Sequence, residues 1–376
     1  MRYWLFIIVM VFINPCISNG MDNDVWTAFR DKSTGLIGYR DSNGIVKIPP
    51  KFIFADAKKF KNIIVVGEQI NRTTSESYYL LKNGKKIGVG SIYIWDNTPD
   101  CESEEKIRFR DKTTEKVGFF DKNGKIIIPA VYNEALPFRN NMAVGLKNAQ
   151  RVCWSGKKYS EQNKCEHWSW KGGKTFLIND KNEILIKNFN YNRNLDWFSL
   201  KIMDDKKEEL NREVFKGTNG KYYSFINFET EFKNWFKSTF LLSINSDALK
   251  KNCASEIAFW SNAESDWITK QADKFLAENK DCMIRQINDF RMGNMEYTVH
   301  KEPLNPYIFN NEKYAIYFDS CGNAREWQNP VFTVLSSHEN DKGILELDFK
   351  TYFQFLRTRK GYKMISLGTK NKEFKH

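Results

Sequence analysis

Three Asn-Gly pairs are spaced 40 residues apart in the first third of the chain, at Asn43-Gly44, Asn83-Gly84 and Asn123-Gly124. Each pair is flanked by alternating or wholly apolar residues, which is the strongest short-range signal for a β-hairpin. A fixed period of this size is typical of a repeat array. The pattern therefore predicts that the N-terminal half consists of copies of one hairpin-centred unit. Arrays of this kind more often present a surface to a partner than carry an enzyme site.

Aligning the sequence on these turns gives four units. A glycine precedes the turn in two of them, Gly38 and Gly118, where it permits a close backbone approach or marks a bulge. In the same two units a proline ends the second strand, because proline cannot donate to a ladder. An aromatic residue, an alanine and a phenylalanine follow, and we expect them to pack one unit against the next. The units span 37–49, 78–87, 117–129 and 176–186, and the packing residues are Phe52, Ala55, Phe60, Tyr132, Ala135 and Phe138.

This pattern resembles the WG-repeat family of bacterial exported proteins over residues 26–195. The family unit is Trp-Gly, an aromatic residue, an Asp-x-x-Gly-Lys turn and Ile-Pro, followed by an aromatic residue, alanine and phenylalanine. Here Ile37 and Val117 replace the tryptophan, the second unit lacks the glycine and proline, and the fourth lacks the turn glycine. The resemblance implies arrays of β-hairpins with a binding or scaffolding role. It supplies no catalytic residues.

The pattern changes near residue 200. Residues 201–223 are rich in charge and contain glycine, which predicts a linker. Aromatic residues then recur at three- and four-residue steps, and this spacing predicts one apolar helix stripe facing a core. The stripe consists of Phe225, Phe228, Phe232, Trp235, Phe236 and Phe240. Ser246 is expected to cap a short helix, and a longer helix is expected to span 263–280.

Strands are expected after these helices, at 296–300, 313–319, 331–336, 343–349, 352–357 and 362–367, with a hairpin turn at 359–361. Helices followed by an antiparallel meander indicate an α+β domain with an antiparallel sheet. Its closing strands are similar to the end of NTF2-like domains, which implies a curved sheet around helices. The expected fold class is therefore mixed, an all-β hairpin repeat array followed by an α+β domain. The expected division is a signal peptide at 1–20, a repeat domain at 21–200, the linker, and an α+β domain at 224–376.

The N-terminus begins with Met1-Arg2 and a short apolar run at residues 3–13, which is typical of a secretory signal peptide. The run is shorter than the ~18 residues that span a bilayer, and cleavage is expected after Ser18 or Gly20. An uncleaved N-terminal anchor is the alternative. The expected location is periplasmic or secreted, with no membrane span after signal removal. The net charge of +12 then favours anionic envelope surfaces over nucleic acid, for which no binding motif is present.

Removal of the signal peptide removes Cys16 and leaves six cysteines. An even number in an exported chain predicts disulfides. Proximity in sequence favours Cys153–Cys165 and Cys253–Cys282, which leaves Cys101–Cys321 to connect the two halves. Other pairings remain open at this stage.

The fourth turn, at Asn182, follows Asn123 by 59 residues instead of 40, so residues 148–172 are an insertion. Trp168 and Trp170 would share one face of a strand there. Exposed tryptophans can stack on sugar rings or apolar partners, and lysines can meet anionic groups. The candidate binding loop consists of Trp154, Trp168, Trp170, Lys157, Lys158 and Lys171, closed by Cys153–Cys165.

Two alternatives apply to this loop. The tryptophans can pack against the repeat sheet while the cystine staples a long connection. Zinc at Cys153, Cys165 and His167 fits the residue types, but an export signal argues against it.

No serine-hydrolase, zinc-protease, P-loop or dinucleotide motif is present, and no cofactor or metal is expected. A nucleophile at Cys253 or Cys282 beside His300 requires an unpaired thiol. We therefore expect a non-enzymatic exported module that binds or scaffolds a protein or an anionic envelope glycan. The alternatives are a hydrolase-type enzyme with a site in the C-terminal pocket, and an immunity or accessory protein of a secreted toxin.

Overall fold

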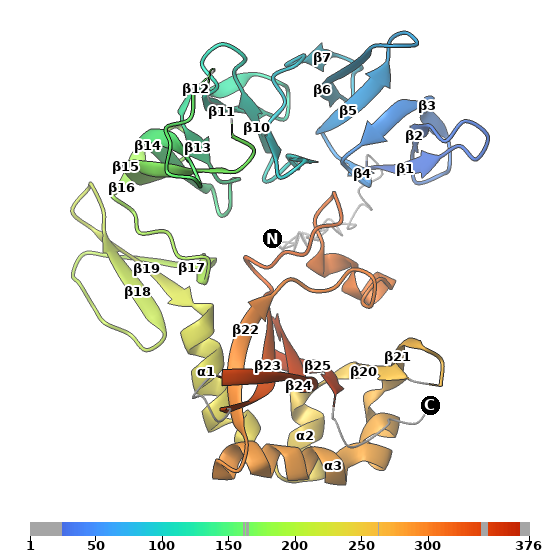
Figure 1. Cartoon of the computed structure of the whole chain (residues 1–376), viewed down its shortest axis with the longest axis vertical. Coiled ribbons are helices and arrows are strands. Elements are labelled where there is room, and N and C mark those ends of the chain that lie inside the picture. Colours follow the sequence, from blue (N-terminus) through green and yellow to red (C-terminus); the bar gives the residue numbers. More distant parts are fainter. Residues whose placement is uncertain (1–24, 161, 163–164, 262, 340–344, 369–376) are drawn as a thin grey trace, which may run out of the picture.

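The computed structural model describes residues 25–160, 162, 165–261, 263–339 and 345–368. Its sheets follow one another along an arc, and a helix-containing C-terminal part lies below the arc in Figure 1. The predicted signal peptide at 1–20, with Cys16, lies outside the described residues. No described helix is both long and apolar enough to cross a membrane.

The arc begins with a seven-stranded antiparallel sheet in the order β4-β1-β2-β3-β5-β6-β7. Its strands are β1 (Trp26–Arg30), β2 (Ile37–Arg40), β3 (Val46–Ala55), β4 (Lys59–Phe60), β5 (Ile63–Gln69), β6 (Ser75–Leu81) and β7 (Lys86–Ile87). A two-stranded ribbon and a three-stranded sheet follow along the arc. They consist of β8 (Ile94–Trp95) and β9 (Thr98–Pro99), then β10 (Lys106–Arg110), β11 (Val117–Asp121) and β12 (Ile126–Tyr132).

Two further antiparallel sheets complete the arc, with the orders β13-β14-β15-β16 and β17-β19-β18. The first has β13 (Glu134–Ala135), β14 (Met142–Cys153), β15 (Trp168–Asn179) and β16 (Ile184–Lys187). The second has β17 (Leu195–Met203), β18 (Arg212–Lys216) and β19 (Tyr222–Asn227).

One turn geometry recurs along the arc. In the first copy the N–H of Asp41 donates to the carbonyl of Ile45 at 2.9 Å, and the N–H of Gly44 donates to that of Asp41 at 3.0 Å. Gly44 has a φ of 81°, a value that glycine adopts without steric cost. The same two bonds close the turns at 81–85, 121–125, 179–183 and 217–221. The four predicted hairpins are therefore confirmed, and two further turns of this type exist in the array, at 153–157 and 217–221.

The turn at 217–221 lies within residues 201–223, and the prediction of a linker there was wrong. These residues contribute the end of β17, all of β18 and the start of β19. Tyr223 and Phe225 are buried against Trp197, with Phe215 packed beside them. Burial of these aromatic side chains outweighs the local density of charge. The charged residues 204–209 form only the exposed connection between β17 and β18.

The two unit glycines are required by backbone crowding. A β-carbon on Gly118 would lie 2.6 Å from the carbonyl oxygen of Ile128, and one on Gly38 would lie 2.6 Å from that of Ile48. The strand register also shifts at both positions. At both glycines, the close approach of the neighbouring backbone therefore coincides with a β-bulge.

Neighbouring units pack through aromatic side chains, as the repeat pattern predicts. Tyr79 of the second unit lies edge-on to Phe120 of the third, with ring centroids 5.5 Å apart. Its hydroxyl donates to the carbonyl of Arg108 at 2.7 Å. The predicted packing residues Phe52, Phe60, Tyr132, Ala135 and Phe138 are buried, and Ala55 is partly buried against the same cores.

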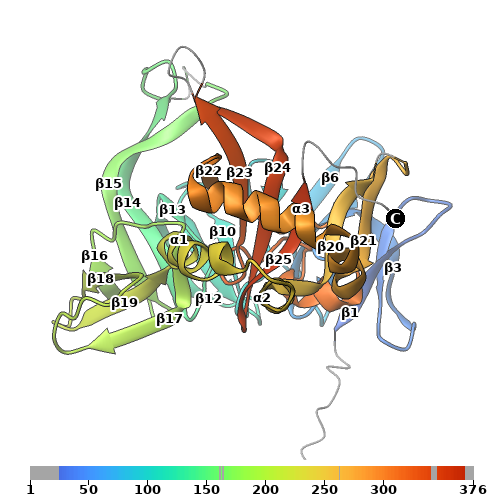
Figure 2. The ribbon, with the colours of Figure 1, turned by 90° about the horizontal axis from the view of Figure 1, so that it is seen from below.

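The C-terminal part is a six-stranded sheet in the order β21-β20-β25-β24-β23-β22. Its strands are β20 (Cys253–Ser261), β21 (Asp266–Gln271), β22 (Glu296–Glu302), β23 (Val331–Glu339), β24 (Leu345–Thr358) and β25 (Gly361–Gly368). The helices are α1 (Phe228–Ser238), α2 (Ser246–Asn252) and α3 (Ala272–Met292), and the short 3-10 turns are η1 (Phe240–Leu242) and η2 (Glu312–Tyr317). Figure 2 shows α3 crossing the sheet.

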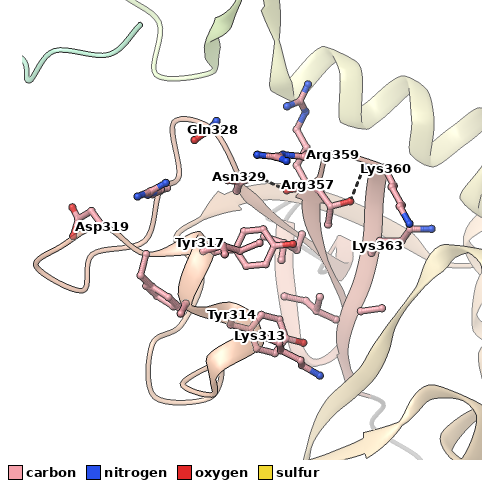
Figure 3. Close-up of a pocket in the computed structure, with 18 of the residues that line it drawn as sticks. Lys313, Tyr314, Tyr317, Asp319, Gln328, Asn329, Arg357, Arg359, Lys360 and Lys363 are labelled. Carbon is pink, nitrogen blue, oxygen red and sulfur yellow. Dashed lines mark hydrogen bonds between the residues drawn. The ribbon is translucent and has the colours of Figure 1, made fainter. Parts of the chain in front are cut away.

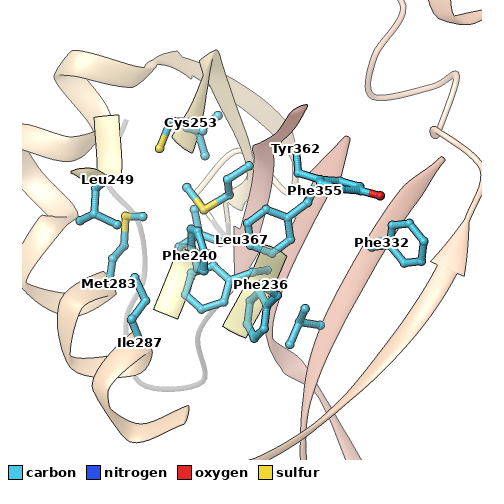
Figure 4. Packing of buried hydrophobic residues seen from close by; sticks show 14 of the residues in the cluster. Phe236, Phe240, Leu249, Cys253, Met283, Ile287, Phe332, Phe355, Tyr362 and Leu367 are labelled. Atoms are coloured by element: carbon cyan, nitrogen blue, oxygen red, sulfur yellow. The ribbon is translucent and has the colours of Figure 1, made fainter. Parts of the chain in front are cut away.

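The helices cover one face of this sheet and form the largest core. Phe236 and Phe240 of the predicted stripe face Phe355 of β24, while Met283 and Ile287 of α3 close the other side (Figure 4). Helix α1 is shorter than the stripe, because Phe225 belongs to β19 and Phe240 to η1. The Asn227 side chain caps α1 by accepting from the N–H groups of residues 229 and 230.

Several C-terminal expectations need correction. The sheet is not purely antiparallel, because β20 runs parallel to β25. The helix expected at 263–280 begins only at residue 272, since β21 pairs along β20 before it. The strand expected at 313–319 is largely η2. The strands expected at 343–349 and 352–357 are, from residue 345 onward, the single strand β24 with a register shift, and residues 343 and 344 lie outside the described residues. The remaining expected strands are confirmed, and the NTF2-like resemblance stays a prediction.

The segment at 303–330, between β22 and β23, reaches from this sheet to the repeat array (Figure 1). Its turn at 319–323 has the same two backbone bonds as the hairpin turns. The N–H of Lys59 donates to the carbonyl of Ser320 at 2.9 Å. A disulfide between Cys101 and Cys321 joins the two halves at this point.

Candidate functional site

The sequence-predicted binding loop lies at the end of a long hairpin, which we call the arm. Its strands β14 and β15 have 12 residues each and stay paired from Met142–Asn179 to Cys153–Trp168. Figure 2 shows them extending beyond the neighbouring strands. The disulfide Cys153–Cys165 closes the loop as predicted, with a Cα–Cα distance of 5.9 Å. The arm is therefore a projecting hairpin with a disulfide near its tip.

Two of the predicted tryptophans form a cluster on the arm around one cation. The rings of Trp168 and Trp170 meet edge-on at 5.2 Å, which confirms that they share one strand face. The Arg151 guanidinium carbon lies 4.6 Å from the Trp168 ring centroid and 5.2 Å from that of Trp170. Both tryptophans are half-buried, and their ring contacts are with Arg151, Tyr159 and each other, all on the arm. The alternative that they pack against the repeat sheet stays a prediction.

Trp154 differs from these two because it is 74% exposed. Its ring stacks on His167 at a centroid distance of 4.9 Å. The predicted residues Lys157, Lys158 and Lys171 are also exposed. The structure therefore brings an accessible indole and cationic side chains together on the arm. Both cysteine sulfurs are in the disulfide, so they are not available as zinc ligands.

The predicted Cys253–Cys282 disulfide is wrong, because both cysteines are free. Cys253 is buried where β20 begins in the core, whereas Cys282 lies half-exposed on α3. Burial raises the pKa of the Cys253 thiol to about 12. A thiol of this kind is protonated near neutral pH and is a weak nucleophile.

A second candidate site, which the sequence did not indicate, is a cavity between the C-terminal sheet and the repeat array. Its larger lobe has a volume of about 980 Å³ and its smaller lobe about 620 Å³. Both lobes are lined by Lys61, Phe198, Asp319, Ser320, Arg325 and Gln328. We call the two lobes together the central cavity.

Cationic side chains dominate the larger lobe. Figure 3 shows Arg359 and Lys360 at one end of it and Asp319 at the other. Arg357 is neutralised, because its guanidinium lies 3.1 Å from the Asp196 carboxylate and 2.8 Å from that of Glu231. These ion pairs raise the pKa of Arg357 against the opposing effect of burial. Arg357 is thus a structural residue. Lys313, which pairs with Glu256, and Lys363, which donates to the carbonyl of Lys251, are also engaged within the protein.

The cations that line the central cavity come from elements far apart in the sequence. Lys59 begins β4 and Lys61 directly follows it. Arg325 lies in the segment before β23, and Arg359 lies in the turn after β24. No short motif connects them, so a sequence pattern cannot assign them to one site.

One repeat of the array matches a known family model. Residues 118–148 match the family model described as WG containing repeat. They begin at Gly118 in β11 and continue through β12 and β13 into β14, so the match is the third predicted unit with its connection to the arm. No curated protein and no solved structure matches the chain.

Proposed function

We propose that this chain is a non-enzymatic, exported binding protein in which the repeat array holds out the arm to an envelope or extracellular partner. The observation that carries the proposal is the exposure of Trp154, which is 74% accessible at the tip of the arm. An exposed indole beside cations suits contact with a protein or an anionic glycan. The WG containing repeat that leads into the arm supports a binding role.

The two disulfides support an oxidising compartment, because disulfides persist mainly in exported proteins. The intact mass of the protein from its native cells tests this part of the proposal. We expect the loss of about 18–20 N-terminal residues. Alkylation under denaturing conditions should label Cys253 and Cys282 and no other cysteine. An uncleaved chain, or labelling of Cys101 or Cys153, would contradict export.

Sedimentation with purified cell envelopes tests the contact surface. We expect the variant Trp154→Ala/Lys157→Gln/Lys171→Gln to lose at least about tenfold in affinity, equivalent to about 1.4 kcal/mol. The matched control is Trp95→Ala, because Trp95 is also an exposed tryptophan, 55% accessible, but lies on β8. Equal binding by the arm variant and the wild type would show that the arm is not the contact surface.

A further inference from the structure

The central cavity holds more positive than negative charge that is free to act on a ligand. Its lining includes six cations for which the described part of the chain provides no ion pair. Within that part they also have no side-chain hydrogen bond. They are Lys59, Lys61, Arg139, Arg325, Arg359 and Lys360.

The acidic side chains of the cavity are occupied by the fold. Glu102 accepts from the backbone N–H groups of Asn62 and Ile63, each at 3.1 Å. Asp196 is paired with Arg357. The remaining carboxylates also have partners within the protein. Glu104 accepts from the N–H groups of Asn140 and Asn141, and Glu105 forms an ion pair with Lys122. Asp319 accepts from the N–H groups of Cys321 and Asn323. Within the described residues, these carboxylates make structural contacts and form no ion pair with the six cations.

Arg139 gives an independent indication of a ligand. It lies in the turn before β14, lines the smaller lobe, and has its guanidinium carbon 3.7 Å from the Trp327 ring centroid. Its Nε is shielded from solvent and has no hydrogen-bond partner within the described residues. Burial lowers the pKa of Arg139 to about 10. A buried N–H group normally has a hydrogen-bond acceptor, because leaving it without one costs about 1–3 kcal/mol of stability.

We propose that the central cavity binds a small oxyanion-rich ligand, carrying at least two phosphate or carboxylate groups, between the repeat array and the C-terminal segment. Arginine suits such groups because its planar guanidinium donates two parallel hydrogen bonds to them. Arg139 and Arg325 therefore hold anionic groups in the smaller lobe, where both line the wall. Lys59, Arg359 and Lys360 meet further charge in the larger lobe.

The shape of the cavity restricts the ligand further. Phe198 lies where the two lobes meet, and Tyr317 lines the larger one. Aromatic faces there suit the uncharged portion of a ligand, such as sugar rings. A volume of about 980 Å³ lies at the upper end of the range for small-molecule sites. The site is separate from the arm, so it does not depend on the function proposed above.

Isothermal titration calorimetry with two probes tests the inference on the full-length mature protein. Tripolyphosphate presents phosphates, and trigalacturonate presents carboxylates on sugar rings. We expect at least one probe to bind with one-to-one stoichiometry and with an affinity that falls as salt rises. Binding of tripolyphosphate alone identifies a phosphate site, and binding of trigalacturonate alone identifies a carboxylate site.

Arginine variants locate the binding. Arg139→Gln and Arg325→Gln should each weaken affinity at least tenfold. Arg291→Gln should change affinity less than twofold, because Arg291 is exposed on the last turn of α3, away from the cavity lining. Thermal unfolding verifies that each variant is folded, and Arg325→Gln keeps the test decisive if Arg139→Gln is unstable. Failure of both probes to bind at millimolar concentration, or full affinity in Arg325→Gln, would overturn the proposal.

Discussion

Loss of the Cys101–Cys321 disulfide should destabilise the protein more than loss of Cys153–Cys165. The two bonds close sequence separations of 220 and 12 residues. A cross-link removes an unfolded-state entropy of about 2.1 + 1.5R ln n cal/mol/K, which corresponds to about 5 kcal/mol for the long loop and about 3 kcal/mol for the short one at 25 °C. We therefore predict these losses in the free energy of unfolding for Cys101→Ser/Cys321→Ser and Cys153→Ser/Cys165→Ser.

Urea denaturation followed by far-ultraviolet circular dichroism measures both changes. The slope of free energy against urea should rise in each double variant, because the unfolded chain becomes less compact. Cys282→Ser is the control, since Cys282 is a half-exposed free thiol and its substitution should change stability by less than about 0.5 kcal/mol. A long-loop variant as stable as wild type, or more stable than the short-loop variant, would refute the reasoning.

Three further predictions concern the glycines of the repeat unit, the buried carboxyl of Asp56 and the cap of helix α1. Gly118→Ala should lower the free energy of unfolding by about 2 kcal/mol or more, because the new β-carbon would clash with the Ile128 carbonyl. Gly44→Ala should lower it by only about 1 kcal/mol, because its β-carbon would meet nothing within 4 Å and only the positive φ is unfavourable. Urea denaturation compares the two, and a larger loss at Gly44 would contradict this explanation. Burial, reinforced by the charge of Asp100, raises the pKa of Asp56 well above its usual range. The stability associated with the neutral carboxyl is therefore full below the unfolded pKa of about 4 and is lost as pH rises through the folded value. Asp56→Asn should gain stability relative to wild type between pH 4 and pH 8 in thermal unfolding, and a constant difference would contradict the direction of the shift. Asn227→Ala should cost about 1 kcal/mol in the same assay by removing the cap of α1, and an unchanged midpoint would show that water replaces it.

The hairpins were predictable because their signal is local. Each of these turns needs positive φ at one position, and the glycine of the Asn-Gly pair supplies it without help from the rest of the chain. The turn at 217–221 has the same signal at Asn219-Gly220, but the charge of the preceding residues suggested a linker. The turn at 319–323 follows the same Asp-x-x-Gly pattern and could have been found by searching for the aspartate and glycine alone.

The C-terminal strands were harder to place because long-range pairing decides them. β20 and β21 lie side by side with six paired positions, and this pairing prevents the helical spacing around Trp267 from forming a helix. The central cavity depends on the same kind of information. Its cations converge only after the segment at 303–330 docks on the array, and no local pattern encodes that contact.

The Cys101–Cys321 disulfide also constrains how the protein is made. Synthesis proceeds from the N-terminus, so Cys101 emerges 220 residues before its partner. Four other cysteines emerge in that interval: Cys153, Cys165, Cys253 and Cys282. A thiol that oxidises with the next available one forms a wrong pair, which must then be resolved by attack of another thiolate. Correct pairing therefore requires either delayed oxidation or an isomerase, and the yield of native protein should depend on which of these the producing cell supplies.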